Sequence, residues 1–525
     1  MSSKIVISSK RNLSRKYRAA LAQIESRLQR LIQADQQRGI ATRVAYLDDL
    51  LSLQPFGISD IANVADARSV KDLLDKILST WSFDHILILG GDQIIPFFRF
   101  DNPAGDSDTS VTTDNPYANS GSASGSRDDF LVPDRSLGRL PDEEIYEEPG
   151  ISPTPELLLR QLDRLSEYQC AGAEPGAANT IAVSAEDWRG ASQAVLLGIG
   201  ITVGVTLSPP LDIRQGGFPV HSITNKRIHY WNCHGSRILP LWAGQGGTSK
   251  PPCMHPDELR DAVNVADSLV SSEACHGANI IGKNVQTSIC LKYLWKGAIA
   301  FQGSTTIAYG MPNGSLRFPD PNIWNQKWAA DLMSEYFLTN CLNGASCGES
   351  LQETKYRYFE ERVNSRGGLL AEDKKTLLQF VLYGDPSIRV SFAPAAENWN
   401  KRLQRAKSLE AIGTARQILR ESDKGMFTEV PDQLFRPLSH ILEEVKRAQP
   451  DYKLSLLQSL QIEREDRYAK AAGFAPVAYW HEIYFVSPQI DQATKEVISD
   501  VDSYLVVVVE QVGDKVSVIQ AGLSR

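Results

Sequence analysis

The first third of the chain alternates short apolar runs with segments whose apolar residues recur at helical spacing. Residues 4–9, 41–48 and 85–91 are apolar runs of strand length, and they predict three β-strands. Residues 14–38 and 70–81 lie between these runs with an amphipathic pattern, which predicts two helices. Strands that alternate with helices in this way indicate a mostly parallel sheet with helices on its faces.

A second β/α series begins after a Gly/Ala/Pro-rich stretch, and the pattern changes again near residue 395 to helical segments and then a β-rich ending. The strands expected in this second series lie within residues 180–187, 227–236, 267–277, 297–306 and 381–392. We therefore predict an α/β fold made of two α/β subdomains, followed by an α+β module. The expected boundaries are 1–170 with a flexible insertion near 101–130, 171–395 for the catalytic subdomain, and 396–525 for a regulatory or interaction module.

Composition excludes several classes of protein. A chain of 525 residues with 42% apolar and 22% charged residues has the balance of a soluble globular protein. The formal charge of −8 gives no electrostatic reason to expect nucleic acid as a partner. No apolar run approaches the roughly 20 residues that span a bilayer, and the first residues lack the pattern of a secretory signal. We expect a cytoplasmic protein without a membrane partner, in which seven cysteines without a CxxC pair are free thiols.

Two expected strands of the second series end in residues that can do chemistry. One run ends at His234-Gly235 and another ends at Cys275. The carboxyl ends of neighbouring parallel strands face one crevice, so a thiol and an imidazole can meet there as nucleophile and base. Two other interpretations stay open at this point. A lone strand cysteine is usually a small buried hydrophobe, and a zinc site could use Cys233, His234, Cys275 and His276, although adjacent strand residues point to opposite faces.

Six motifs in order resemble gingipain-type cysteine peptidases, which belong to the fold group of caspases and metacaspases. The resemblance runs from about residue 4 to about residue 392. The motifs are ILILGGDQIIPFF, RSLGRLPD, YWNCHGS, SSEACHGA, AIAFQGSTTIAYG and LYGDPSIRV. The resemblance implies a caspase-like fold, cysteine endopeptidase activity and protein substrates. No cofactor is required by it, although relatives often bind calcium.

The same resemblance assigns roles to individual residues. Cys275 would be the nucleophile and His234 the general acid/base. The backbone N–H groups of Gly235 and Cys275 would form the oxyanion hole. Glu186, which ends the run TIAVSAED, stands where gingipains have a glutamate that orients the histidine. A solvated acid at a strand end is the alternative for Glu186.

The residues that select the substrate are predicted with Glu273 at their centre. It stands two residues before Cys275, where metacaspases and caspases have a residue of the S1 pocket, and strand residues two apart share a face. A buried carboxylate needs a partner, and an incoming basic side chain would provide one, Arg better than Lys. An internal arginine such as Arg237 is the alternative partner. Ser304, Thr305 and Tyr309 are expected pocket walls by resemblance.

Restraint of the protease is also expected. Arg127 follows the GSASGS stretch, a setting suited to cleavage, so processing there by the protein itself or an upstream protease would release activity. The acidic residues of the 101–134 segment could hold a calcium ion, but they lack EF-hand spacing and a solvated loop is expected instead. A bacterial defence or cell-death protease with a regulatory partner fits this interpretation by analogy. A catalytically inactive caspase-like scaffold and a metal-binding structural protein are the competing hypotheses.

Overall fold

The computed structural model describes residues 2–144, 154–170, 176–311, 327–366, 368–390, 427–428, 432–463, 477–487, 502–512 and 515–525. The helix expected at residues 401–422 lies outside the described residues. Within them, no helix combines the length and the apolar character needed to cross a bilayer.

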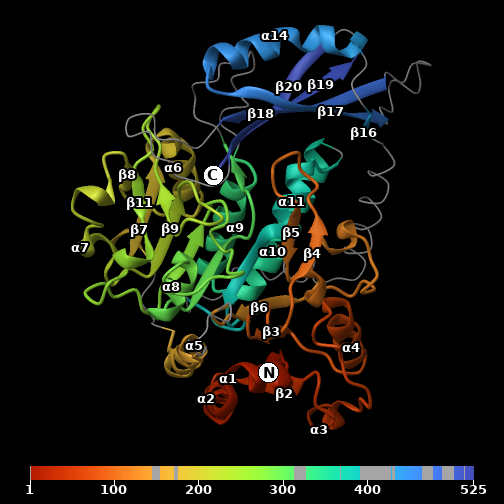
Figure 1. Cartoon of the computed structure of the whole chain (residues 1–525), viewed down its shortest axis with the longest axis vertical. Coiled ribbons are helices and arrows are strands. Elements are labelled where there is room, and N and C mark those ends of the chain that lie inside the picture. Colours follow the sequence, from red (N-terminus) through yellow and green to blue (C-terminus); the bar gives the residue numbers. More distant parts are fainter. Residues whose placement is uncertain are drawn as a thin grey trace.

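One continuous sheet of ten strands runs through the α/β part (Figure 1). Its strands are β1 (Ser2–Ser8), β2 (Ile40–Tyr46), β3 (His85–Leu89), β6 (Ser136–Leu140), β7 (Thr180–Ala185), β8 (Val205–Ser208), β9 (Ile228–Asn232), β12 (Leu269–Ser272), β13 (Ala300–Ser304) and β15 (Phe380–Gly384). Their order is β2-β1-β3-β6-β15-β13-β12-β9-β7-β8. The predicted α/β fold class is confirmed.

The sheet consists of two halves, joined edge to edge, and β15 (Phe380–Gly384) belongs to the first half although it lies within the expected second subdomain. The strands within each half are parallel, and β15 is parallel to β6 but antiparallel to β13. We call β2, β1, β3, β6 and β15 the first half, and β13, β12, β9, β7 and β8 the second half. The halves therefore run in opposite directions, with the reversal at the β15–β13 pair.

Helices cover the sheet. They are α1 (Lys10–Tyr17), α2 (Leu21–Gln37), α3 (Leu50–Leu53), α4 (Ala67–Thr80), α5 (Glu156–Glu167), α6 (Arg189–Gly198), α7 (Val220–Ile223), α8 (Ile289–Trp295), α9 (Ala330–Leu342), α10 (Cys347–Arg366) and α11 (Ala371–Gln379). In some, such as α4, the apolar positions lie along one side, whereas α9 and α11 are buried nearly all round. In α4 the side chain of Asp66 accepts the N–H of Arg68 and so caps the first turn, and Val70, Leu74 and Ile77 are buried.

Alternate strand residues of the second half face two separate cores. Tyr230 and Leu269 belong to one apolar cluster, while Trp231 and Val270 belong to another on the opposite face. This is the period of two that a strand imposes when both faces are covered. Continuous apolar runs such as those of β9 and β12 follow from this double burial.

The C-terminal module is a second sheet that lies across the α/β part (Figure 1). It consists of β16 (Phe427–Thr428), α14 (Asp432–Ala448), β17 (Lys453–Glu463), β18 (Val477–Ser487), β19 (Ser503–Val512) and β20 (Lys515–Ser524). A short strand of the α/β part, β14 (Tyr309–Gly310), completes the sheet, whose order is β14-β20-β19-β18-β17-β16. The module is thus joined to the α/β part by strand pairing.

Both faces of the C-terminal sheet are buried. Leu505 and Val507 pack with Leu438 of α14 on one face, while Val506 and Val508 pack on the other in an apolar cluster that includes Cys275. The run LVVVV in β19 is explained by this arrangement, because neighbouring residues enter different cores. The module therefore rests directly on the region that contains the candidate nucleophile.

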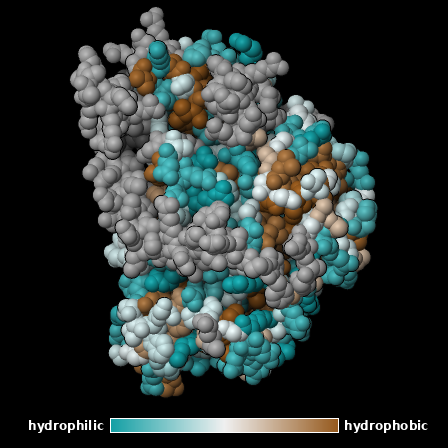
Figure 2. All heavy atoms as spheres, turned by 180° about the vertical axis from the view of Figure 1, so that it is seen from behind, coloured by the Kyte–Doolittle hydropathy of each residue, from teal (hydrophilic) through white to brown (hydrophobic). Residues whose placement is uncertain are grey.

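Outside these cores, few large apolar side chains are exposed. Figure 2 shows hydrophilic residues over much of one face, with hydrophobic groups between them. The exposed large apolar residues of the described chain are Leu50, Leu51, Ile61, Leu197, Ile238 and Leu454. Scattered exposure of this kind is normal for a protein surface and needs no partner to explain it.

The segment expected to be a flexible insertion contains regular structure. Strands β4 (Phe98–Asp101) and β5 (Ser110–Thr113) pair antiparallel, and a helical turn follows at Asn115–Ala118. Polar side chains bind the backbone here: Asn115 donates to the carbonyl oxygens of Phe130 and Leu377. Asn, Asp and Ser are typical of loops, but in this segment their side chains satisfy buried backbone groups.

Candidate active site

The ends of β9 and β12 bring His234 and Cys275 into one region. The two strands are parallel neighbours, and the N–H of Glu273 continues their ladder by donating to the carbonyl oxygen of Trp231. A side chain at position 235 would overlap the carbonyl oxygen of Cys275, so only glycine allows this close approach of the two strand ends. The predicted meeting of the His-Gly and Ala-Cys motifs is present in the structure.

The imidazole of His234 is buried and oriented by Gln245. Its Nε2 lies 2.7 Å from Oε1 of Gln245, an atom that can only accept, so Nε2 carries the hydrogen. The ring of Trp188 packs edge-on against it at 4.6 Å between centroids. Burial, with a smaller effect from the charge of Lys250, holds the pKa of His234 well below its ordinary value. The histidine is therefore neutral, and Nδ1 is its basic nitrogen.

Glu186 lies next to this arrangement, at the end of β7. Its carboxylate pairs with Arg189 at 3.2 Å, and both side chains are about half exposed. The following residue, Asp187, joins the loop of Gln245, because its N–H donates to the carbonyl oxygen of Gln245. Gln245 thus holds the imidazole nitrogen that Glu186 is expected to orient, and the role of Glu186 stays a prediction.

The last residue of the sequence, Arg525, lies against the candidate nucleophile. The backbone N–H of Cys275 donates to the carbonyl oxygen of Arg525 at 3.1 Å. The N–H of Arg525 donates to the carbonyl oxygen of Ala308 at 2.8 Å, and Ser524 pairs with Tyr309 in the antiparallel β14–β20 ladder. In Figure 1 the chain end marked C lies where the C-terminal sheet meets the second half.

The side chain of Arg525 enters a buried pocket with two acids. Its Nη2 lies 2.9 Å from Oδ1 of Asp331, and its Nε lies 3.7 Å from Oε2 of Glu273. The guanidinium also lies over the ring of Trp188, 4.2 Å from the centroid. All three side chains, those of Arg525, Asp331 and Glu273, are completely buried. Two carboxylates and an aromatic ring form a site suited to a planar cation.

Glu273 is fully buried and points toward Tyr230 and the guanidinium of Arg525. Its Oε1 accepts a hydrogen bond of 2.6 Å from the hydroxyl of Tyr230. Burial, and then the nearby charge of Asp331, raise the pKa of Glu273 well above its ordinary value, while Arg525 opposes this shift. The arginine that faces Glu273 comes from the same chain, as one alternative expected, but it is Arg525 and not Arg237.

The thiol of Cys275 is closed off from solvent. The residue is 2% exposed, and the N–H of Ala308 points to Sγ at 3.3 Å. Burial raises the pKa of Cys275 to about 12, and the hydrogen bond from Ala308 opposes the shift only in part. A thiol in this environment is protonated and unreactive at neutral pH.

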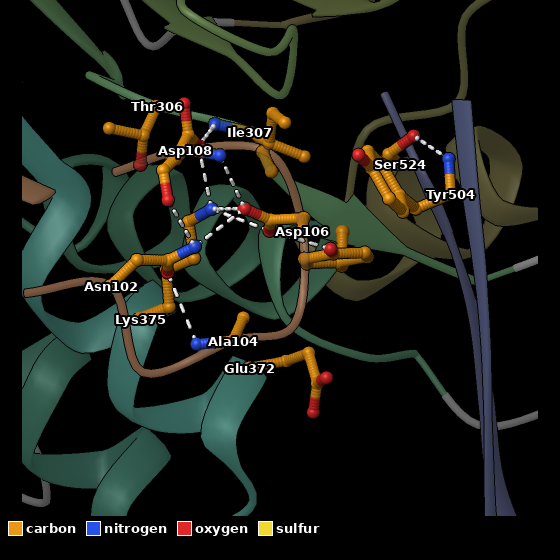
Figure 3. A network of polar contacts seen from close by, with 12 residues as sticks. Asn102, Ala104, Asp106, Asp108, Thr306, Ile307, Glu372, Lys375, Tyr504 and Ser524 are labelled. Atoms are coloured by element: carbon orange, nitrogen blue, oxygen red, sulfur yellow. Dashed lines mark hydrogen bonds and ion pairs between the residues drawn. The ribbon is translucent and has the colours of Figure 1, made fainter. Parts of the chain in front are cut away.

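A charged network holds the segment that carries Ala308 and Tyr309 (Figure 3). Nζ of Lys375 lies 2.6 Å from Asp106 and 2.7 Å from Asp108. Asp108 accepts the N–H of Ile307, and Asp106 accepts the hydroxyl of Tyr309. These acids belong to the segment considered for calcium, and a buried ammonium balances their charge. Among the described residues, no three His, Cys, Asp or Glu side chains gather as a metal site requires.

The remaining predicted residues occupy different places. Tyr309 borders the cleft through the β14 backbone, which pairs with Ser524. Ser304 is buried at the end of β13 and donates to the carbonyl oxygen of Thr306, while Thr305 donates to that of Thr112. Arg127 begins a helical turn, Arg127–Phe130, with its side chain 29% exposed and paired with Asp128. Cleavage there stays a prediction.

Four residues of the site were not predicted from the sequence: Trp188, Gln245, Asp331 and Arg525. Trp188 directly follows the Glu186 motif, and Gln245 lies in the glycine-rich stretch after His234, so both were near recognised motifs. Asp331 had a weaker signal, an acid at the start of the apolar helix α9. An acid in such a helix is a departure from the burial pattern, and departures of that kind often mark sites.

The fold is of the caspase-like α/β class, and in it a cysteine and a histidine follow neighbouring strands of one sheet. Residues 243–391 match the family model "Peptidase family C25", a family of cysteine peptidases. The match includes Cys275, Glu273 and Asp331 and begins after His234. The resemblance to gingipain-type peptidases is thereby confirmed.

Two further comparisons add little. A solved structure described as "Structure of Protease" has 14% sequence identity, with a TM-score of 0.46, over 99% of this chain and 97% of that chain. No curated protein matches the chain.

Proposed function

We propose that the protein is a cysteine endopeptidase that cleaves after arginine, with Cys275 as nucleophile and His234 as general acid/base. One observation carries the proposal: Arg525 occupies the position of a P1 residue. Its carbonyl oxygen accepts from the N–H of Cys275, and its guanidinium enters the pocket of Glu273 and Asp331. A substrate arginine placed in the same way would present its carbonyl carbon beside the thiol.

The proposed reaction follows from these positions. Nδ1 of His234 takes the proton of the Cys275 thiol as Sγ attacks the carbonyl carbon of the P1 residue. The N–H of Cys275, joined by that of Gly235, stabilises the oxyanion. The imidazolium then protonates the leaving amine as the C–N bond breaks, which leaves an acyl-enzyme. Water, deprotonated by the histidine, hydrolyses the thioester and restores the thiol.

Two neighbours would tune the imidazole. Gln245 fixes the tautomer by accepting from Nε2, and Trp188 holds the ring plane. Glu186, close to the Gln245 loop, would stabilise the imidazolium through its charge. Departure of residues 523–525 would expose the thiol and the imidazole to water, which lowers the pKa of the thiol and raises that of the imidazole.

The preference for arginine over lysine rests on the shape of the pocket. Asp331 and Glu273 face different nitrogens of one guanidinium, and Trp188 lies against its plane. An ammonium is a point charge and could not address both acids and the ring in this way. Glu273, Asp331 and Trp188 are therefore the proposed specificity residues, with Tyr309 in the cleft wall.

The proposal extends to a cytoplasmic protease under restraint, in a bacterial defence or cell-death pathway. Its support is the cysteine content without a pairing pattern and the closed state of the thiol, and the pathway rests on analogy.

The test is a peptidase assay with fluorogenic peptides that differ only at P1, carrying Arg, Lys, Asp or Ala. The assay uses the intact chain and the Arg525→Ala variant, each with and without Cys275→Ala. We expect release after arginine that falls by at least about 10⁴-fold in Cys275→Ala. Cys290→Ala, which removes another fully buried thiol, is the matched control and should keep full activity. Absence of cysteine-dependent release after arginine in both backgrounds would reject the proposal in favour of a scaffold.

A further inference from the structure

We infer that the end of strand β20 is a resident, substrate-like ligand of the cleft, which keeps the protease closed until residues 523–525 leave it. Only one part of the inference, that the occupied cleft blocks peptidase activity, rests on the proposed function. It concerns a different property, the occupancy of the cleft by the chain itself, and this can be measured without any peptidase activity.

The backbone of β20 binds as an extended peptide substrate would. Tyr309 pairs with Ser524 and Gly310 pairs with Leu523, antiparallel. The Arg525 N–H and carbonyl oxygen continue this pattern to Ala308 and Cys275. Addition of a strand to an exposed edge is a common mode of peptide recognition, because main-chain hydrogen bonds bind any sequence and pockets select side chains. Arg525, Ser524 and Leu523 thus stand in the positions P1, P2 and P3.

Two glycines allow this close packing. A side chain at position 522 would overlap the ring of Trp328, and one at position 310 would overlap the guanidinium of Arg525. Trp328 is fully buried, and its Nε1 donates to Asp373 at 2.9 Å, so the ring has little room to move. The strand therefore fits the cleft only with glycine at position 522, as a ligand matched to its site would.

The occupied cleft excludes an outside substrate. Arg525 is 1% exposed and Cys275 is 2% exposed, so neither the pocket nor the thiol is open to a second peptide. A substrate arginine needs the same two acids and the same N–H of Cys275. Binding of substrate and seating of β20 are mutually exclusive.

Opening requires only the end of the strand to move. Pairing between β19 and β20 extends from Leu505–Leu523 to Val512–Lys515, so most of the hairpin can stay intact when Leu523, Ser524 and Arg525 leave. A tethered ligand competes at an effective concentration of about millimolar, which suppresses substrates at lower concentration. We expect Arg525→Ala to raise kcat/KM for arginine peptides by roughly tenfold or more.

The first measurement is alkylation of Cys275 by iodoacetamide, followed by peptide mass spectrometry. In the intact chain Cys275 should resist the reagent as strongly as Cys290 does. Arg525→Ala, and independently Gly522→Ala, should increase alkylation of Cys275 at least tenfold and leave Cys290 protected. Lys515→Ala removes an exposed cation from the far end of the same strand and should change nothing.

A second measurement adds the strand end in trans. The hexapeptide QAGLSR, residues 520–525, should inhibit Arg525→Ala and protect its Cys275, whereas the same peptide with alanine in place of arginine should do neither. Far-UV circular dichroism checks the fold of each variant. If either Arg525→Ala or Gly522→Ala does not fold, alkylation of Cys275 in the other variant and in the intact chain still tests the inference.

The outcomes separate the two proposals. Increased alkylation with no peptidase activity in any variant would support the closed cleft and reject the proposed function. Equal alkylation and equal activity in the intact chain and Arg525→Ala would keep the function and overturn the inference. Rapid alkylation of Cys275 in the intact chain would also overturn it.

Discussion

Each half of the large sheet buries an arginine beside carboxylates, and the two arginines are bound differently. In the first half, all three guanidinium nitrogens of Arg139 donate hydrogen bonds, to both oxygens of Asp114 and to the carbonyl oxygens of Gly90 and Ile95. At the second half, only Nη2 of Arg525 has a hydrogen-bond partner among the described residues. Both guanidiniums lie over an aromatic ring, Phe97 or Trp188.

The difference separates a structural arginine from a ligand-like one. The guanidinium of Arg139 makes four hydrogen bonds, to the carboxylate of Asp114 and to two backbone carbonyl oxygens, so all three of its nitrogens are bound. Arg525 has one side-chain hydrogen bond among the described residues, to Asp331, and its Nε lies 3.7 Å from Glu273. The looser binding of Arg525 suits a site that releases one arginine and accepts another. A guanidinium with every nitrogen hydrogen-bonded would exchange less readily.

Replacement of each arginine by methionine is the strongest test of this comparison. Arg139→Met leaves Asp114 buried without its bidentate partner and should lower the free energy of unfolding by about 3–5 kcal/mol. Arg525→Met should cost less than half as much, because Glu273 and Asp331 can share a proton in a cleft that then opens to water. Urea denaturation of both variants measures the difference. Equal losses would show that Arg525 is a structural residue.

Removal of one acid from the arginine pocket should have a smaller effect than replacement of the arginines. In the Arg525→Ala background, Asp331→Asn should lower kcat/KM for arginine peptides by roughly 10–100-fold, because a hydrogen bond to a charged group is lost. The loss for lysine peptides should be smaller, since the fork-shaped contact is absent there.

Glu335→Gln is the matched control for Asp331→Asn. Glu335 lies one turn further along α9 and pairs with Lys327 instead of the cleft arginine. Its substitution should leave the ratio of arginine to lysine cleavage unchanged. A similar change of that ratio in both variants would mean that Asp331 acts through the helix and not in the pocket.

Each half of the sheet contains a buried histidine, and we expect both histidines to lower the stability of the protein in acid by a similar amount. This is the smallest of the predicted effects. Burial lowers the pKa of His85 on β3 and of His229 on β9 to about 4. The unfolded chain then binds more protons than the native protein between pH 6.5 and 4, so stability falls as the pH falls through this range. Each histidine should contribute about 2 kcal/mol of destabilisation at pH 5 relative to pH 8.

Denaturation midpoints at several pH values check this expectation. His85→Gln and His229→Gln should each reduce the loss between pH 8 and pH 5 by a similar amount, whatever their effect at pH 8. An unchanged pH dependence in either variant would show that this histidine is protonated in the native state.

Sequence patterns predicted the parts of the structure that are local. The β/α alternation and the strands that precede His234 and Cys275 follow from periods of two and 3.6. The opposite direction of the two halves was not predicted, because periodicity carries no information on strand direction. Periodicity also does not indicate which strands pair, so the pairing of the two-residue strand β14 with β20 was not predicted.

Two of the unpredicted site residues, Asp331 and Arg525, are distant in the sequence from the motifs they complete. Asp331 lies 56 positions after Cys275, and Arg525 lies 250 positions after it (331 − 275 and 525 − 275). Only the packing of α9 and β20 against the cleft brings them to Glu273. Gln245 lies in a glycine-rich loop, and its bond to His234 depends on a loop conformation that composition does not specify.

Strand β14 is shared by two structures, since it is both the wall of the cleft and the edge of the C-terminal sheet. A substrate that displaces residues 523–525 takes over hydrogen bonds that the sheet otherwise makes. A partner that binds the displaced strand end, or stabilises the sheet with its edge uncovered, must by linkage strengthen substrate binding by the same factor. Binding of a partner to the C-terminal sheet can therefore change the substrate affinity of the cleft. The two-residue strand β14 couples the two binding events.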